Sequence, residues 1–266
     1  MNIDLQQDVI NVSKGDKTIR ISSKHAIYVR DVVTQFDYYY NSVEPVDGVV
    51  DFSKPAFHCV KGYPVPIMFP SFSEPLESTR QYLDFAQLKP GDVVLDLGAY
   101  SGLTSILFAQ AVGHTGKVVA VEADVTNLDC MTVNLAGYSN ITTIFGAVWE
   151  HNNGVEFSTE TNMGSSAAAI VGRRGLMRSV PSGTLSSIME KAQLDRVDFI
   201  KVDIEGAEKV IFHDAAFFER YHPRMIIETH HTDEHVIATL VNLGYHVKRV
   251  IQNGVRFPLL ECVYNA

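Results

Sequence analysis

Two acidic residues lie at the ends of neighbouring apolar runs in the middle of the sequence. Asp96 is in the run "DVVLDL", which is followed by Gly98 and Gly102, and Glu122 ends the run "KVVAVE". The glycines allow the backbone to turn sharply and to lie close to a ligand. The next helix begins at Ser101 or Gly102, so its free N–H groups point toward the same place. We therefore predict a ligand beyond the carboxyl ends of two buried strands.

The residue types favour one kind of ligand over another. Ala99 stands where a dinucleotide-binding loop has its middle glycine, so the close approach of a pyrophosphate is disfavoured. The negative charge of Asp96 would also repel a diphosphate, whereas it suits a cationic amine. A carboxylate at Glu122 can accept hydrogen bonds from two ribose hydroxyls. Together these residues fit S-adenosylmethionine better than NAD.

A second set of polar residues follows two later apolar runs. Asp203 and Glu205 come after "FIKV", and Glu228 and His230 come in and after "MII". Strand alternation places Lys201 on the face of Asp203, and Glu228 on the face of His230. A hydroxyl acceptor must lose its proton, and Asp203 with His230 is the predicted base region. Asp203, Glu228 and His230 also suit magnesium or manganese, an alternative that the sequence leaves open.

The elements that position these residues alternate regularly from residue 92 onward. Apolar runs alternate with helical spacing, which predicts right-handed crossovers and a parallel sheet. The expected strands are 92–97, 117–122, 141–148, 197–203 and 224–230. The expected helices are 76–88, 101–112, 124–136, 182–193, 206–221 with a break near His213-Asp214, and 232–243.

Two of these helices show which side chains should face inward. The expected inward residues are Leu103, Ile106 and Leu107 in the first, and Val125, Leu128, Thr132 and Leu135 in the second. Asp124 and Thr232 are the expected N-caps. Asn253-Gly254 joins two further strand-like runs and is favoured in type I′ hairpins. An antiparallel hairpin is therefore expected where a nicotinamide-binding fold would continue with a crossover helix.

The first 75 residues have a different pattern. They contain a strand-like segment (18–22), a helical pattern (25–40) and then a proline-rich stretch typical of edge strands and loops. We expect residues 1–75 to form an α+β N-terminal extension, acting as a substrate cap or in oligomerisation, and residues 76–266 to form the main domain. The aromatic residues at 38–40 are expected in a core or an interface.

Four segments in order resemble one known family. "VVLDLGAYSG", "VVAVEAD", "VDFIKVDIEGAE" and "PRMIIETHH" are similar to the FkbM family of class I S-adenosylmethionine-dependent methyltransferases. The resemblance covers about residues 74–264. It implies an α/β, Rossmann-like fold with a seven-stranded, mostly parallel sheet that ends in the antiparallel hairpin. Ala123-Asp124 departs from the family pattern, which often has proline after the acid.

The resemblance also implies roles for individual residues. Asp203, Glu205 and His230 would be catalytic, Ser165 and Ser166 would orient the substrate, and Thr79 would reach the amino-acid end of the cofactor. The cofactor-binding residues that it implies are Glu77, Asp96, Gly98, Ala99, Tyr100, Ser101, Gly102, Glu122, Ala123, Asn127, Gly146, Ala147, Val148 and Asp203.

The composition of the chain limits the classes of binding partner and the compartment that we expect. A net charge of −9 argues against nucleic acid as a partner, because binding would require many phosphate contacts. The three cysteines lack the spacing of a zinc site or a disulfide framework, which favours a reduced, cytoplasmic location. Nothing in the sequence reads as a membrane-spanning segment. A homo-oligomer is compatible with the sequence.

The resulting prediction is an S-adenosylmethionine-dependent O-methyltransferase. Its acceptor would be a hydroxyl of a sugar or another small metabolite, and its product S-adenosylhomocysteine. Two alternatives stay open at this point. One is an NAD-dependent oxidoreductase, and the other is a protein that binds the cofactor without catalysis.

Overall fold

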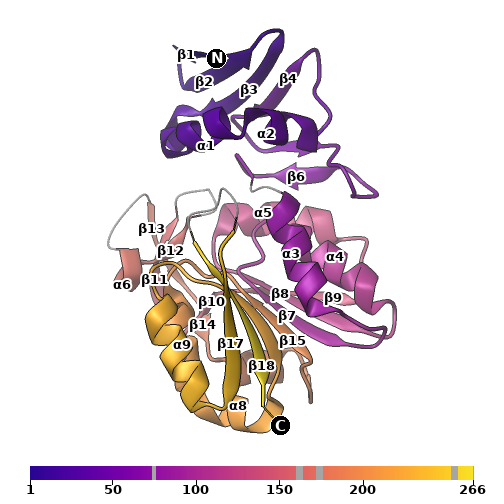
Figure 1. The fold of residues 1–266 in the computed structure, drawn as a ribbon, viewed down its shortest axis with the longest axis vertical. Coiled ribbons are helices and arrows are strands. Elements are labelled where there is room, and N and C mark those ends of the chain that lie inside the picture. Colours follow the sequence, from indigo (N-terminus) through magenta and orange to yellow (C-terminus); the bar gives the residue numbers. More distant parts are fainter. Residues whose placement is uncertain (74–75, 160–163, 172–175, 253–256, 266) are drawn as a thin grey trace.

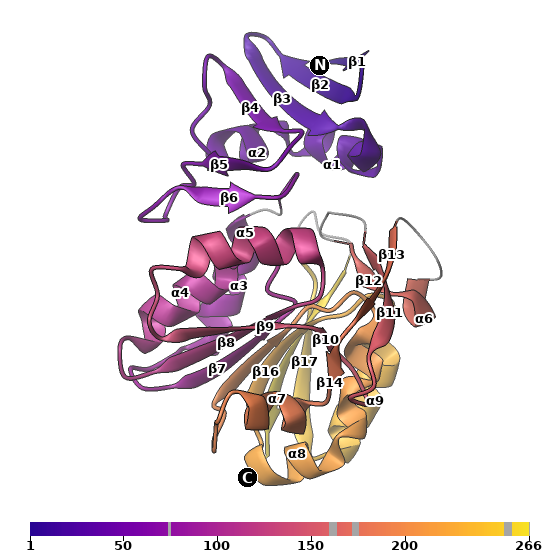
Figure 2. The same cartoon turned by 180° about the vertical axis from the view of Figure 1, so that it is seen from behind.

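The computed structural model describes residues 1–73, 76–159, 164–171, 176–252 and 257–265, and no side chain of residues 76–78 or 171. The chain forms two stacked parts (Figure 1). An N-terminal unit, residues 1–73, lies over one edge of a larger α/β part formed by the later residues. Figure 2 shows the same arrangement from behind.

The larger part is built on a mixed sheet, which has seven strands among the described residues. Its order is β17-β18-β16-β15-β7-β8-β9, with β16, β15, β7, β8 and β9 parallel. The strand bounds are Tyr245–Val250 (β17), Leu259–Tyr264 (β18), Arg224–Glu228 (β16), Phe199–Val202 (β15), Val93–Leu97 (β7), Lys117–Glu122 (β8) and Ile141–Phe145 (β9). The order reverses between β7 and β15, where ligands bind in such sheets.

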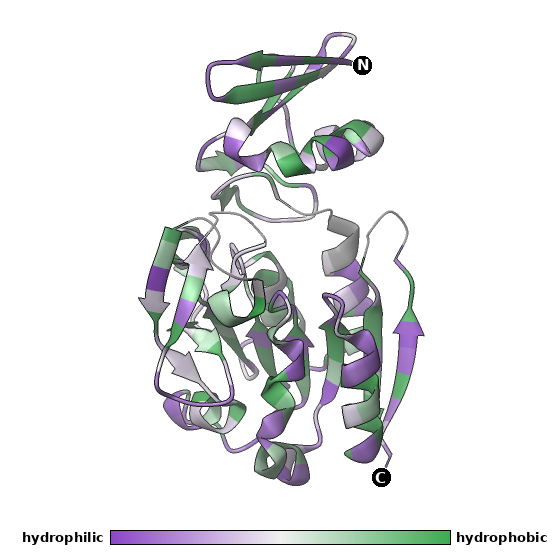
Figure 3. Ribbon diagram, turned by 90° about the vertical axis from the view of Figure 1, so that its left-hand side faces the viewer, coloured by the Kyte–Doolittle hydropathy of each residue, from purple (hydrophilic) through white to green (hydrophobic). Residues whose placement is uncertain are grey.

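Helices cover both faces of this sheet. On one face of the sheet, Val94 of β7 packs in a hydrophobic cluster with Phe108 and with other residues of the helices that cover this face. On the opposite face, Leu95 packs in a separate cluster. The first face is covered by α3 (Leu76–Ala86) and α4 (Leu103–Val112), and α5 (Val125–Leu135) packs beside them. The second face is covered by α7 (Leu185–Lys191), α8 (Ala215–Tyr221) and α9 (Asp233–Asn242). Figure 3 shows hydrophobic strands behind helices with hydrophilic outer residues.

The sheet ends as the sequence predicts. β17 and β18 pair antiparallel, and β18 also pairs antiparallel with β16. The class of fold, α/β and Rossmann-like with a closing hairpin, is therefore confirmed. The Asn253-Gly254 turn itself lies outside the described residues. The expected break in the segment 206–221 is also present, because short 3-10 turns at Ala207–Lys209 and Ile211–His213 precede α8.

The inward faces of two helices differ from the prediction. In α5 Thr132 is exposed, Val125 and Leu128 are half-buried, and Asn127 and Asn134 are buried together with the correctly predicted Leu135. These amides are buried because they have partners or line a cavity, which hydrophobic spacing cannot indicate. In α4 Leu107 is half-buried, whereas the buried residues occupy most of the helix surface: Leu103, Thr104, Ser105, Ile106, Phe108, Ala109 and Val112. The helix has few outward residues because the sheet and the N-terminal unit both pack on it.

Small sheets lie beside the large one. β10 (Ala147–Val148) pairs with β14 (Ser182–Gly183), and β11 (Val155–Thr159) lies between β12 (Ser166–Ala167) and β13 (Leu176–Val180). The short helix α6 (Ala168–Val171) follows β12. The expected strand 141–148 is divided into β9 and β10, because the backbone at Gly146 leaves the strand conformation with φ 149°.

The N-terminal unit has its own sheet, of order β1-β2-β3-β4 among residues 1–52. Its strands are Asn2–Gln6 (β1), Val9–Lys14 (β2), Lys17–Ser22 (β3) and Val49–Phe52 (β4). The expected helix 25–40 is divided into η1 (Ser23–Tyr28), α1 (Val29–Thr34) and α2 (Phe36–Ser42). Two strands, β1 and β2, were not expected. Ala56–His58 (β5) and Ile67–Phe69 (β6) form a separate antiparallel pair.

The N-terminal unit is joined to the larger part through polar and apolar contacts. The side-chain amide of Asn134 in α5 donates to the backbone oxygens of Met68 and Ser101, and its oxygen accepts from the Met68 N–H. The Tyr100 hydroxyl donates to the Phe72 carbonyl oxygen at 3.3 Å. Buried residues of both parts also form one hydrophobic cluster. Among the described helices, none is long and apolar enough to cross a membrane.

Candidate active site

The loop that follows β7 is built from unusual backbone conformations. Gly98, Tyr100 and Gly102 all have positive φ, and Gly102 is the N-cap of α4. A Cβ atom at Gly98 would lie 1.7 Å from the Asp203 carbonyl oxygen. Only glycine therefore lets the loop after β7 lie against the loop after β15. The sequence prediction of a sharp turn at both glycines is confirmed.

Asp96 lies beneath this loop. It is fully buried, its Oδ2 accepts a 2.6 Å hydrogen bond from Ser105 of α4, and its Oδ1 is 3.4 Å from Lys201 Nζ. Asp96 and Lys201 are directly opposite each other on β7 and β15, so their side chains are on one face of the sheet. The cavity described below is not lined by Asp96. Asp96 thus supports the loop from below, and its contact with a cofactor amine stays a prediction.

Lys201 connects the two loops at the switch point. It is 3% exposed, donates to the Gly98 carbonyl oxygen at 2.7 Å, and its Nζ is 3.5 Å from Asp203 Oδ2. Asp96 and Asp203 are therefore its ion-pair partners. Glu228 accepts a 2.6 Å hydrogen bond from the Tyr82 hydroxyl of α3.

Glu122 is held at the end of β8 by backbone N–H groups. Its Oε2 accepts from Tyr100 at 2.8 Å, and its Oε1 accepts from Ala123 at 2.9 Å and from Asp124 at 2.7 Å. Burial raises the pKa of Glu122 to about 7, although these hydrogen bonds act in the opposite direction. Of roughly four lone-pair sites on a carboxylate, the backbone uses three.

A cavity of about 950 Å³, part of it open to solvent, lies beyond the carboxyl ends of β7, β8 and β15. Ten of the fourteen predicted cofactor-binding residues line it: Gly98, Ala99, Tyr100, Glu122, Ala123, Asn127, Gly146, Ala147, Val148 and Asp203. Asp96, Ser101 and Gly102 do not line it, and the side chain of Glu77 lies outside the described residues. The lining also includes residues that the cofactor prediction missed: Ser73, Tyr82, Leu103, Thr104, Val121, Trp149, Phe157, Ala167, Lys201, Ile204 and Ala207.

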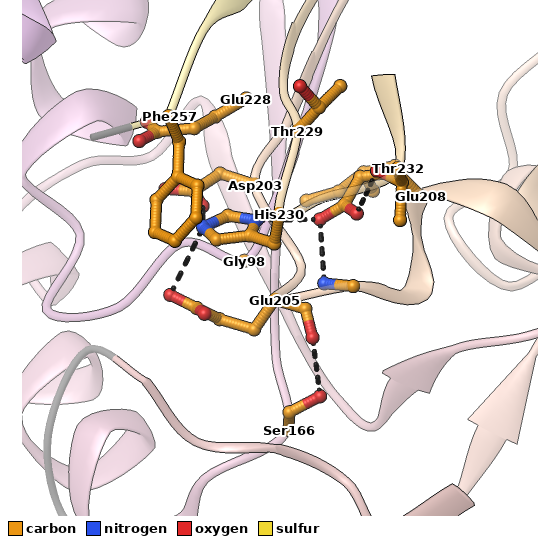
Figure 4. Close-up of polar contacts among 12 residues, drawn as sticks. Gly98, Ser166, Asp203, Glu205, Glu208, Glu228, Thr229, His230, Thr232 and Phe257 are labelled. Atoms are coloured by element: carbon orange, nitrogen blue, oxygen red, sulfur yellow. Dashed lines mark hydrogen bonds and ion pairs between the residues drawn. The ribbon is translucent and has the colours of Figure 1, made fainter. Parts of the chain in front are cut away.

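A carboxylate–imidazole cluster lies at one wall of the cavity (Figure 4). His230 Nδ1 is 2.9 Å from Glu208 Oε1, and its Nε2 is 3.5 Å from Glu205 Oε1 and 3.8 Å from Asp203 Oδ1. Asp203 and Glu205 line the cavity, and the His230 side chain is 9% exposed behind them. The Phe257 ring packs against the imidazole with 4.6 Å between ring centres.

Glu208 anchors this cluster. It is fully buried and accepts from His230, from the Gly206 N–H at 2.9 Å and from the Thr232 hydroxyl at 2.9 Å. Thr232 is the N-cap of α9 as expected, but its side chain bonds to Glu208 and not to the helix N–H groups. The sequence offered one signal for Glu208, its place in "DIEGAE" after a buried strand.

Charge is shared unequally in the cluster. Burial lowers the pKa of His230, but Glu205, Glu208 and Asp203 raise it more, to about 10. Burial raises the pKa of Glu205 to about 8, although the charge of His230 acts against this shift. Burial also acts to raise the pKa of Glu208, but its hydrogen bonds and the charge of His230 outweigh burial and bring that pKa below its usual value. The three carboxylates therefore favour the positively charged form of the imidazole.

Backbone strain also converges on this region. Tyr100, Glu205 and His231 have φ of 51°, 52° and 62°, and they lie in the loops after β7, β15 and β16. Such conformations are costly for residues other than glycine, and they concentrate at functional sites. Ser165 and Ser166 hold the neighbouring segment, because Ser165 Oγ donates to Asp124 at 2.7 Å and Ser166 Oγ donates to the Glu205 carbonyl oxygen at 2.6 Å.

The residues that could bind a metal ion differ from those that the sequence suggested. Ligand atoms of Asp203, Glu205 and His230 lie within 4.8 Å of one another, which makes them a possible metal-binding group within the described chain. Glu228, which the sequence suggested in place of Glu205, is buried against Tyr82. Glu205 thus replaces Glu228 in the set of candidate metal ligands.

The fold and the site define a class I methyltransferase architecture. Residues 96–247 match the model of the methyltransferase FkbM domain, which is more than half of the chain. The chain therefore belongs to the FkbM methyltransferase family, and the resemblance seen in the sequence is confirmed. No curated protein matches the sequence.

Several solved structures align with this chain. Methyltransferase FkbM from Methylobacillus flagellatus KT aligns with a TM-score of 0.50 at 18% identity, over 70% of this chain and 50% of that one. Precorrin-6y C5,15-methyltransferase from Geobacter metallireducens GS-15 aligns with a TM-score of 0.48 at 17% identity, over 73% and 90%. Aeropyrum pernix fibrillarin, solved with natively bound S-adenosyl-L-methionine, aligns with a TM-score of 0.47 at 15% identity, over 99% and 98%.

Proposed function

We propose that the protein is an S-adenosylmethionine-dependent O-methyltransferase that acts on a hydroxyl of a sugar or another small metabolite. The observation that carries this proposal is the position of Asp203. Its side chain lines the cavity, and its two oxygens lie near Lys201 at 3.5 Å and His230 at 3.8 Å. A cofactor site and a proton-accepting cluster thus meet at one residue.

The residues present fit the cofactor. Glu122 keeps one acceptor site for a ribose hydroxyl, and Gly98 permits close approach of the backbone. The buried Ser73 hydroxyl lines the cavity and has no hydrogen-bond partner among the described residues, so it is available to a polar ligand group. Val148, Phe157 and other apolar side chains line a wall that suits a purine. Bound there, S-adenosylmethionine would supply an electrophilic methyl group.

The cluster supplies the chemistry that a hydroxyl acceptor requires. A hydroxyl keeps its proton at neutral pH, so its methylation needs a proton acceptor at the reacting oxygen. Asp203 and Glu205 present carboxylate oxygens at the cavity, and His230 holds both through its Nε2 edge. The pKa of His230 falls when a positive ligand occupies the neighbouring cavity, because like charges disfavour each other. We assign acceptance of the proton to this cluster.

The N-terminal unit is the proposed acceptor cap. It lies over the edge of the sheet where the strands end (Figure 1), and its last described residue, Ser73, lines the cavity. Tyr100 joins the cofactor loop to this segment through the Phe72 carbonyl oxygen. Acceptors would therefore enter between the unit and the loops after β15 and β16.

Methyl transfer from labelled S-adenosylmethionine to a panel of sugars and hydroxylated metabolites tests the proposal. We expect His230→Ala to lower kcat by about 10²–10⁴-fold, because general acid–base groups contribute on that scale. The affinity for S-adenosylhomocysteine should stay within about threefold, since His230 does not line the cavity. His213→Ala is the matched control, because His213 also pairs with a carboxylate, Glu150 at 2.6 Å, but on the surface.

Full activity of His230→Ala would refute the assignment of the base.

The same assay with EDTA or added magnesium tests a second candidate for activating the hydroxyl, a divalent ion held by Asp203, Glu205 and His230. Loss of wild-type activity in EDTA, restored by magnesium, would favour the ion. Activity unchanged by EDTA would favour direct proton transfer to the cluster.

A further inference from the structure

The first strand of the N-terminal unit is an unprotected sheet edge. β1 is the outer strand of the order β1-β2-β3-β4, and all five of its residues are exposed. It lies at the outer side of the unit, away from the larger part of the chain (Figures 1 and 2). A strand in this position presents a row of unpaired backbone N–H and C=O groups.

One face of β1 is apolar and continues the core face of the sheet. Ile3 is opposite Val12 of β2, and Leu5 is opposite Ile10, so each pair shares a face. Val12 and Ile10 are buried in the core, whereas Ile3 is 53% exposed and Leu5 is 63% exposed. The apolar face of the sheet therefore extends beyond the part that the helices cover.

The strand lacks the features that usually prevent edge pairing. It contains no proline and no lysine, its only charged residue is Asp4, and its register with β2 runs without a bulge from Asn2 to Gln6. We propose that this edge pairs antiparallel with β1 of a second copy of the chain. Two four-stranded sheets would then form one continuous sheet across a two-fold axis.

Charge and apolar pairing select one register. Centring the axis on Asp4 would place two aspartates directly opposite each other, which is destabilising. Centring it on Leu5 would place Ile3 opposite Gln7, which lies in the turn after β1 with φ 54°. Centring it on Ile3 places Ile3 opposite Ile3, Met1 opposite Leu5, and Asn2 opposite Asp4. This register has the most apolar pairs and no like-charge pair, so we assign the axis to Ile3.

The expected dimer is weak. Two five-residue edge strands bury less than the ~1,200 Å² of a standard interface, which is typical of transient association. We therefore expect dissociation in roughly the micromolar range. The strand contributes no residue to the cavity, so dimerisation and methyl transfer can be tested separately.

Cysteine cross-linking tests both the partner and the register. In a Cys59→Ser background, which removes the exposed native thiol, Ile3→Cys should form a disulfide-linked dimer under mild oxidation. Leu5→Cys is the matched control, because two such residues would lie about 13 Å apart along the strands in this register. Cross-linking through Leu5→Cys alone, or through neither variant, would overturn the proposal.

Sedimentation at increasing protein concentration tests the native interface without a cross-link. Ile3→Lys should weaken dimerisation at least ~10-fold, because two like charges then meet at the axis. Val46→Lys is the control, since Val46 is 74% exposed beside β4, the opposite edge of the same sheet. A wild-type protein that stays monomeric at high concentration, or a dimer weakened equally by both substitutions, would refute pairing through β1.

Discussion

Gly98→Ala is expected to weaken binding of S-adenosylhomocysteine by at least ~100-fold. The added Cβ would lie 1.7 Å from the Asp203 carbonyl oxygen and 2.8 Å from its carbonyl carbon. Both are backbone atoms, so no side-chain rotation relieves the overlap and the two loops must separate. A misplacement of about 1 Å can cost ~100-fold in rate at a catalytic site, and we expect a loss of similar size in affinity here. Isothermal titration of the folded variant gives the affinity directly.

Gly113→Ala is the matched control for this experiment. Gly113 also has positive φ, 65°, but a Cβ there meets nothing within 4 Å. Its substitution therefore adds backbone strain without an overlap, and affinity should be unchanged. Near-normal binding by Gly98→Ala would show that contact between the two loops does not set the cofactor site.

Lys201→Met is expected to lower the free energy of unfolding by about 3–5 kcal/mol. The substitution leaves Asp96 fully buried without its cation, and removing one partner of a buried ion pair costs this much. It also removes the hydrogen bond to the Gly98 carbonyl oxygen. Urea unfolding followed by circular dichroism measures the loss.

Two further variants separate charge from packing. Asp96→Asn combined with Lys201→Met should recover part of the lost stability, because no unpaired buried charge then remains at Asp96. Lys248→Met removes an exposed pair with Glu261, whose atoms are 2.9 Å apart, and should cost less than about 1 kcal/mol. Equal losses for the two lysines would contradict the buried network.

The sequence predicted the turns of the loop after β7 because the signals for them are local. Gly98 and Gly102 mark turns wherever the rest of the chain lies, and their positive φ values follow from that. The succession of strands and helices along the chain follows from hydrophobic spacing, and the closing hairpin was expected from a favoured turn dipeptide. Parallel strands that are buried on both faces read as continuous apolar runs, which made them easy to locate.

The same burial explains what the sequence missed. All five residues of β7 are buried, so no alternation showed that Asp96 faces α4. The partner of Lys201 depends on the register between β7 and β15, which local patterns do not contain. Glu208 and Asn134 are buried polar residues whose partners come from distant segments, so hydrophobic spacing placed neither of them inside.

Isothermal titration of the wild-type protein with S-adenosylhomocysteine and with NADH, repeated with Glu122→Ala, tests the central claim most directly. We expect the first ligand to bind and NADH not to bind. We also expect Glu122→Ala to weaken the affinity at least ~10-fold, because a site built to bond hydroxyls loses its acceptor. A folded wild-type protein that does not bind S-adenosylhomocysteine, or that binds NADH instead, would contradict the assignment of the cavity.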